Sequence, residues 1–245
     1  MALTRFLTTC LLTAATACSV LAWPASAQDA EDDASFPTLF AGNPIFRDGL
    51  TGFQTLDGRG FSLERQANTT LFQMNGQTEV WALESVPGPR GDEFLKNDSG
   101  RIFVRLTDLG GVILYVPSNP HGMPVDPVSE PQPIARPQFN PGMEDSLRLY
   151  LSLRVGHPID VSIEDTDDEA ERWLQDAGRI AAEALVGSPE EASEISALHI
   201  RLGERADLSM TNNGELTVYV SPEQGFEGRP SSDSLTIYVK RRIAS

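Results

Sequence analysis

The first half of the fold depends on the stretch RIFVRLTDLGGVILYV, residues 101–116. Ile102, Val104 and Leu106 alternate with the residues between them, which is the period of a half-buried β-strand. Two glycines then interrupt the pattern where a turn needs permissive backbone angles, and β-branched and aromatic side chains resume over residues 112–116. The stretch therefore predicts two neighbouring strands of an antiparallel sheet.

Short segments of the same composition precede this stretch and are separated by turn residues such as Asn75-Gly76. They predict strands over residues 61–65, 70–75 and 79–86. Residues 61–116 are therefore expected to form an antiparallel β-meander. Residues 28–60 are expected to be a loosely structured lead-in, because glycine and proline are frequent from Phe36 to Gly60 and no period holds there for long.

A proline-rich connector follows the meander, because residues 117–142 contain eight prolines. Proline fixes the φ angle and has no amide hydrogen to donate. We therefore expect this segment to be extended and incompatible with a sheet, as a linker or as a strap over the surface. It also marks a soft domain boundary.

The remaining residues, 143–245, are expected to be an α+β region that opens with a β-hairpin. Every second residue from Leu147 to Val155 is apolar, and the alternation resumes from Ile159 to Ile163. A three-residue loop over 156–158 would pair these two segments with every apolar side chain on one face.

Two helices and C-terminal antiparallel strands complete the predicted α+β fold. Thr166 opens a capping box, and apolar residues then recur at helical spacing until Gly187. The Ser188-Pro189 pair begins a shorter helix that is expected to end near Leu198. The final strands are expected over residues 207–211, 215–220 and 235–241.

The first 27 residues have the pattern of a secretory signal peptide. An apolar run follows Arg5, and Ala25-Ser26-Ala27 places small residues where a signal peptidase cleaves. The alternative is a lipoprotein that begins at a lipidated Cys18, but Ala15 stands where a bulky Leu is usual, so we favour cleavage after residue 27. Later apolar runs are shorter than the roughly 18 residues that span a membrane, so we predict an exported protein, periplasmic or secreted, without a transmembrane segment in its mature chain.

The mature chain would be strongly acidic, because removal of Arg5 changes the formal net charge from −16 to −17. Phosphate backbones and anionic bilayers repel such a chain, so nucleic acid is not an expected partner. Both cysteines, Cys10 and Cys18, lie in the predicted signal peptide. Neither a disulfide nor thiol chemistry is therefore expected after cleavage.

Catalytic motifs that can be recognised by spacing, such as the nucleophile elbow, the zinc helix and the phosphate loop, are absent from the sequence. His121, His157 and His199 are too dispersed to predict a metal site. The acidic run over residues 164–169 is better explained by helix capping than by calcium binding, and the serines of residues 231–234 are expected in a turn or loop. The catalytic residues are therefore unknown, and neither a cofactor nor a metal is predicted.

The tripeptide Arg90-Gly91-Asp92 matches an adhesion motif, but the prolines and glycines around it favour a tight turn. Gly91 supplies permissive backbone angles, and Asp92 can accept hydrogen bonds from neighbouring amides. We interpret the tripeptide as one corner of the meander.

Two stretches, GPRGDEFLKNDSGRIFVRLTDLGGVILY (residues 88–115) and GFEGRPSS (residues 225–232), are separated by a helical middle. Together they make the chain resemble an uncharacterised family of exported bacterial proteins classed as a domain of unknown function. The resemblance spans about residues 60–232 and implies a bacterial envelope or secreted location. It brings no activity, cofactor or catalytic residue with it.

Two functions from different classes remain open. The first is a non-catalytic envelope or secreted protein that binds an unidentified protein or envelope component through its strands or its proline-rich strap. The alternative is a hydrolase with a carboxylate-based site, for which Asp160, Glu164 and Asp233 are unranked candidates.

Overall fold

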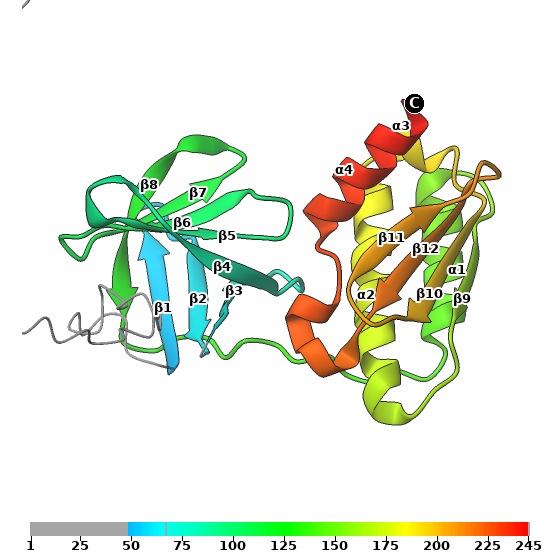
Figure 1. The fold of residues 1–245 in the computed structure, drawn as a ribbon, viewed down its shortest axis with the longest axis horizontal. Coiled ribbons are helices and arrows are strands. Elements are labelled where there is room, and N and C mark those ends of the chain that lie inside the picture. The colour runs from blue at the N-terminus through cyan, green and yellow to red at the C-terminus, as the bar shows by residue number, and fades with distance from the viewer. Residues whose placement is uncertain (1–48, 67, 245) are drawn as a thin grey trace, which may run out of the picture. The chain divides into compact units, whose positions relative to one another are not determined.

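The computed structural model describes residues 49–66 and 68–244. The predicted signal peptide, Cys18 and residues 28–48 of the predicted lead-in lie outside the described residues. An eight-stranded barrel and a four-stranded sheet with helices make up the described part of the chain (Figure 1). The predicted fold, a meander followed by a hairpin, is therefore corrected in several places.

The first eight strands form a closed barrel in which each strand is antiparallel to the next and the last returns to the first. They are β1 (Gly49–Thr55), β2 (Gly60–Arg65), β3 (Thr70–Met74), β4 (Trp81–Pro87), β5 (Glu93–Lys96), β6 (Ile102–Leu106), β7 (Val112–Val116) and β8 (Asn119–Val128), with a short 3₁₀ turn, η2 (Pro89–Gly91), between β4 and β5. The strand order of the predicted meander is present. However, the sheet begins inside the predicted lead-in and closes on itself, which local alternation did not predict.

Aromatic side chains fill the interior of the barrel. The ring of Phe61 lies 5.2 Å from that of Phe53 and 5.1 Å from that of Phe72, and Phe72 meets Phe103 edge-on at 5.1 Å. Buried aliphatic residues of β2 and of β4 to β8 complete this cluster. An eight-stranded barrel has an interior just wide enough for side chains to fill, so these rings are its packed core.

Strand β8 corrects the prediction that the proline-rich connector is incompatible with a sheet. Pro127 lies opposite Phe53 of β1, and Pro124 lies opposite Ile113 of β7, so prolines stand in a strand with a neighbour on each side. Each proline has no backbone N–H and so cannot donate a hydrogen bond to the sheet. Strand β8 as a whole pairs with both β1 and β7, which holds it in place. The rest of the connector has no regular structure, and its Ile134 is buried against the outside of the barrel.

The second region has a four-stranded sheet in the order β11-β12-β10-β9, in which only β11 is antiparallel to its neighbour. Its elements are α1 (Met143–Val155), β9 (Asp160–Ile163), α2 (Asp168–Val186), α3 (Pro189–Ala192), β10 (Ala197–Leu202), β11 (Asp207–Met210), β12 (Glu215–Val220), the 3₁₀ segment η3 (Pro222–Gly228) and α4 (Ser232–Ile243).

Helices α1, α2 and α4 pack on one face of this sheet (Figure 1). Alternate strand residues such as Leu198, Ile200 and Val218 are fully buried against them. The opposite face carries the residues between these, and half-buried His199 and Thr217 lie side by side there. Strand alternation thus builds a two-layer core with one uncovered sheet face.

The predicted hairpin over residues 147–163 is wrong, because its first half is helix α1 and its second half is β9, which pairs with β10 instead. In a helix, residues four apart share a face. Leu147 and Leu151 are therefore buried, whereas Leu149 and Leu153 are 62% and 73% exposed. Leucine and arginine, which dominate this segment, are good helix formers, and this preference outweighs the period of two.

The predicted strand over residues 235–241 is also wrong, because it lies in helix α4. Ser231 caps this helix, and Lys240 and the two arginines that follow it are in its last turn, where cations complement the helix dipole. Helix α2 is capped by Asp167 rather than by Thr166, and the helix expected to run to Leu198 ends at Ala192.

Candidate functional site

The two segments that carry the family resemblance meet in the structure. The turn after β5, residues 97–101, contacts the residues that lead into α4, 229–233. Glu79 of the loop before β4 and Asp176 of α2 bond to the same residues. We call these residues the junction, since they join the barrel to the helices of the second region.

Asn97 both builds its own turn and bonds to α4. Its Oδ1 accepts the backbone N–H groups of Ser99 at 3.2 Å and Arg101 at 3.0 Å. Its Nδ2 donates to Asp233 Oδ2 at 2.9 Å, and Arg101 Nη1 donates to both carboxylate oxygens of Asp233 at 3.1 Å. Because its Oδ1 is held by the turn, the amide group of Asn97 is oriented so that its Nδ2 can donate to Asp233.

Two carboxylates from the barrel cap the N-terminus of α4. Asp98 accepts the backbone N–H of Ser231 at 2.9 Å and also its hydroxyl. Glu79 accepts the backbone N–H of Ser232 at 2.9 Å and likewise its hydroxyl. Ser231 Oγ accepts the N–H of Ser234 at 3.2 Å. The first N–H groups of a helix lack partners within it and carry partial positive charge, so these carboxylates stabilise α4.

Glu79 is only 5% exposed. Burial raises the pKa of its carboxyl above the usual value, although the hydrogen bonds from Ser232 and the charge of Arg229 act in the opposite direction. The carboxylate of Asp233 adds to the rise in pKa. The charge at this end of α4 is therefore sensitive to pH.

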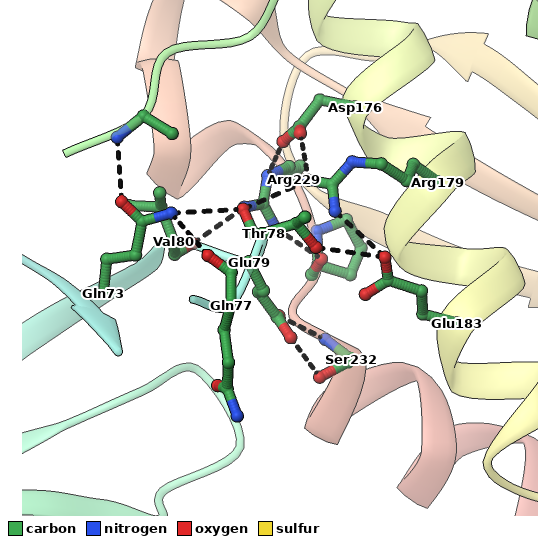
Figure 2. A network of polar contacts seen from close by, with 12 residues as sticks. Gln73, Gln77, Thr78, Glu79, Val80, Asp176, Arg179, Glu183, Arg229 and Ser232 are labelled. Atoms are coloured by element: carbon green, nitrogen blue, oxygen red, sulfur yellow. Dashed lines mark hydrogen bonds and ion pairs between the residues drawn. The ribbon is translucent and has the colours of Figure 1, made fainter. Parts of the chain in front are cut away.

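Arg229 occupies the centre of the junction, with a side chain that is 2% exposed. Its Nη2 donates to the carbonyl oxygen of Val80 at 2.7 Å. Its Nε lies 2.7 Å from Asp176 Oδ2 as an ion pair, at an angle that does not favour a hydrogen bond. Asp176 also pairs with Arg179 at 2.6 Å, as Figure 2 shows. One buried guanidinium thus connects the start of β4 to helix α2.

An apolar cluster lies beside these charges. Leu71 and Val80 of the barrel, Ile134 of the connector and Phe226 of η3 are buried together. Trp173 of α2 meets Phe226 edge-on, with ring centroids 5.0 Å apart. Such a cluster excludes water from the neighbouring polar contacts, which strengthens them.

The junction can hold α2 and α4 against the barrel, because each of its carboxylates bonds to a fixed protein donor. Glu79 and Asp98 bond to the start of α4, Asp176 to two arginines, and Asp233 to Asn97 and Arg101. Its geometry is that of a rigid polar joint.

The structure separates the three carboxylates that the sequence offered for a hydrolase. Asp233 lies in the first turn of α4 and belongs to the junction. Asp160 begins β9, where it is exposed and lies 3.4 Å from Arg148 Nε. Glu164 directly follows β9 and accepts the backbone N–H of Leu202 at 3.1 Å. Each of them thus has a different set of partners.

The histidines are likewise dispersed. His157 bonds to the carbonyl oxygens of Pro158 and Ala192, and His199 Nδ1 lies 2.7 Å from Ser162 Oγ. Within residues 49–66 and 68–244, His, Cys, Asp and Glu side chains form no group of three or more that could hold a metal ion.

The Arg90-Gly91-Asp92 tripeptide forms a tight turn. Arg90 and Gly91 have positive φ angles of 62° and 84°. Asp92 is buried, binds Arg105 Nε at 2.6 Å and accepts the backbone N–H of Asp108 at 3.2 Å. The carboxylate that a receptor would need is therefore engaged inside the protein.

Sequence reasoning singled out Asp233 of the junction, and it expected Ser231 and Ser232 in a turn or loop. That expectation is wrong, because Ser231 caps α4 and Ser232 is its first residue. Asp98 and Arg229 lie within the two stretches that carry the family resemblance. The resemblance could therefore have pointed to these two residues. Glu79 lies between two predicted strand segments and carried no signal, because only tertiary structure brings it to α4.

Comparisons with known proteins identify a family for the chain. No curated protein and no solved structure matches the chain. Within the described part of the chain, the helices are too short or too polar to cross a membrane. A family model described as "Domain of unknown function (DUF4908)" matches residues 47–239, which include both the barrel and the junction. The chain therefore belongs to the uncharacterised family DUF4908.

Proposed function

We propose that this is an exported bacterial protein, periplasmic or secreted, that does not act as an enzyme and binds an extended segment of a partner protein along strand β11. The single observation that supports this function is the open backbone edge of β11. Strand addition to such an edge gives affinity through main-chain hydrogen bonds.

Other strand edges are already occupied. The barrel is closed, so its eight strands pair on both sides. The outer edge of β9 is covered by α1, because Glu144 Oε2 accepts the N–H of Ile163 and Arg148 Nη2 donates to the carbonyl of Val161, both at 3.1 Å. An extended partner has little access to either region.

Strand β11 differs in this respect. Thr211 donates its N–H to the carbonyl of Glu215, which sets the alternation of the β11–β12 ladder. The backbone N–H and C=O groups of Ser209 therefore point toward β12. Those of Leu208 and Met210 point the other way, toward the open edge of the sheet. The N–H of Leu208 bonds to the side chain of Asp207. Within the described part of the chain, the carbonyl of Leu208 and both backbone groups of Met210 are therefore left for a partner.

The test is a crosslinking pull-down from the native envelope with the chain and two variants. Met210→Pro removes the outward N–H without removing a bond to β12. Met210→Ala loses the same side-chain packing but keeps the N–H. We expect wild type and Met210→Ala to capture one common protein and Met210→Pro to lose it, with equal circular dichroism for both variants. Equal capture by Met210→Pro would contradict docking along β11.

Export is tested separately by sequencing the N-terminus of the protein recovered from cells. Cleavage after residue 27 predicts a chain that begins with Gln28 and is found outside the cytoplasm. A cytoplasmic protein that retains its first 27 residues would contradict export, and a lipid on Cys18 would instead identify a lipoprotein.

A further inference from the structure

A small cavity of about 140 Å³ lies beside the junction. The strands β4 and β5, the turn after β5, η3 and the residues before α4 contribute to its walls. The charged and aromatic residues in its walls are Trp81, Glu84, Lys96, Asp98, Phe226, Glu227 and Arg229. A cavity of about 150 Å³ can hold a molecule the size of benzene.

Trp81 provides the first sign of a ligand. Its side chain packs in the barrel core, where the ring of Phe103 lies 5.1 Å away, and the residue is only 8% exposed. The indole Nε1 is buried and has no hydrogen-bond partner among the described residues. A buried donor without an acceptor is costly, so unpaired donors of this kind are rare in folded proteins.

Lys96 is a second donor in the wall of the same cavity. It lies opposite Glu84 in the β4–β5 ladder, but among the described residues its side chain makes neither an ion pair nor a hydrogen bond. The buried indole N–H lacks an acceptor, and Lys96 is a half-buried second donor, so a carboxylate could accept from both at once.

The acids in the wall decide against a simple anion. Asp98 and Glu227 already accept from Ser231 and Thr69, whereas Glu84 has its carboxylate unoccupied among the described residues. Three acids against Lys96 and Arg229 leave one excess negative charge. A ligand that brings its own positive charge therefore fits better than a bare carboxylate.

We propose that this cavity binds a free α-amino acid with a small or medium apolar side chain. Its carboxylate accepts from Trp81 Nε1 and Lys96, its ammonium group faces Glu84, and its side chain lies toward Phe226. This proposal goes beyond the partner docking at β11, since it uses different residues and a different class of ligand.

The test follows the indole N–H signals of the full chain, labelled with ¹⁵N-tryptophan, during titration with L-valine. Two control ligands each keep the branched apolar group and one of the two charges of valine. Isobutyrate has the carboxylate without the ammonium group, and isobutylamine has the ammonium group without the carboxylate. We expect L-valine to shift one indole signal with saturation in the millimolar range or below. Each control ligand should bind at least about tenfold more weakly, the typical loss for one charge-assisted hydrogen bond.

Variants assign the signal and the donors. Trp81→Phe should remove the shifting signal while keeping an aromatic ring in the core. Lys96→Met should weaken binding about tenfold, and Lys240→Met, an exposed lysine on α4, should leave it unchanged. Because Lys96 is half-buried and does not belong to the barrel core cluster, Lys96→Met tests the site even where Trp81→Phe does not fold.

Three outcomes would overturn the proposal: no shift of the Trp81 signal with millimolar L-valine in a folded protein, equal binding of isobutyrate and L-valine, or unchanged affinity in Lys96→Met. None of these bears on capture of a partner by β11, so the two proposals fail independently.

Discussion

The interior of the barrel and the junction are both buried, but opposite kinds of side chain build them. Inside the barrel, Phe61, Phe72 and Phe103 pack ring against ring at 5.1 Å. At the junction, Arg229 and Glu79 are buried to a similar extent, yet each carries an ionisable group that depends on a partner.

This difference separates two ways of stabilising a fold. Apolar burial stabilises in proportion to the area removed from water and changes little with pH. Buried charges lose their hydration, so a pair contributes little net stability, although loss of one partner is costly. The barrel should therefore be robust, and the junction should be specific in its geometry and sensitive to conditions.

The largest effect is expected in the barrel core. Phe72→Ala should lower the free energy of unfolding by about 3–5 kcal/mol, since it removes the ring that contacts both Phe61 and Phe103. Urea denaturation measures the loss. Leu56→Ala, at a position that is 92% exposed, is the control and should change stability by less than about 0.5 kcal/mol. Equal effects of the two substitutions would contradict a packed interior.

A somewhat smaller effect is expected at the junction. Arg229→Met should destabilise by about 3 kcal/mol, because it leaves Asp176 and the carbonyl of Val80 buried without this donor. The double variant Arg229→Met/Asp176→Leu removes both charges and should recover much of the loss. A double-mutant cycle in urea tests this, and strictly additive effects would show that the two residues are not coupled.

The third prediction concerns pH. Because burial raises the pKa of Glu79, the folded state holds this proton more tightly than the unfolded state. The free energy of unfolding therefore includes a contribution from protonated Glu79. This contribution is lost as the pH rises from about 4.5, the ordinary pKa of a Glu carboxyl, through the raised pKa of Glu79 in the folded protein. In this range the free energy of unfolding should fall by up to about 1.4 kcal/mol per pH unit because of Glu79, and Glu79→Gln should remove this slope. Unfolding of both proteins across this pH range gives the difference, and identical slopes would contradict the assignment.

The smallest effect is expected on the outer face of α1. Leu149→Ala should change the free energy of unfolding by less than about 0.5 kcal/mol, since this side chain is 62% exposed. Leu151→Ala, two residues away on the buried face, should cost about 2–5 kcal/mol. Were the segment a strand with all its leucines on one face, the two losses would be similar, so thermal unfolding of the pair distinguishes helix from strand.

Alternation predicted strands where β-branched and aromatic residues accompanied it, as in β6 and β7. It failed in α1, where leucine alternates with arginine, tyrosine and serine and the helix preference of leucine and arginine prevails. It also failed in α4, where the serines before Leu235 are a capping signal that outweighs a short apolar run.

Closure of the barrel and assembly of the junction could not be predicted from local pattern. The first depends on pairing between β1 and β8, which are far apart in the chain. The second depends on contacts such as Asn97 with Asp233 and Glu79 with Ser232, whose partners are far apart in the sequence. Family resemblance pointed to the segments of the junction but not to their contact.

The pairing of β1 with β8 also has a consequence for the order of folding. Gly52 meets Val128 across the seam, so the barrel cannot close until the chain has been synthesised beyond that residue. Contacts between distant parts of a chain form slowly, because the loop between them must first lose entropy. Until then β1 exposes one unpaired edge, and a chaperone that binds extended strands would compete with β8 for it.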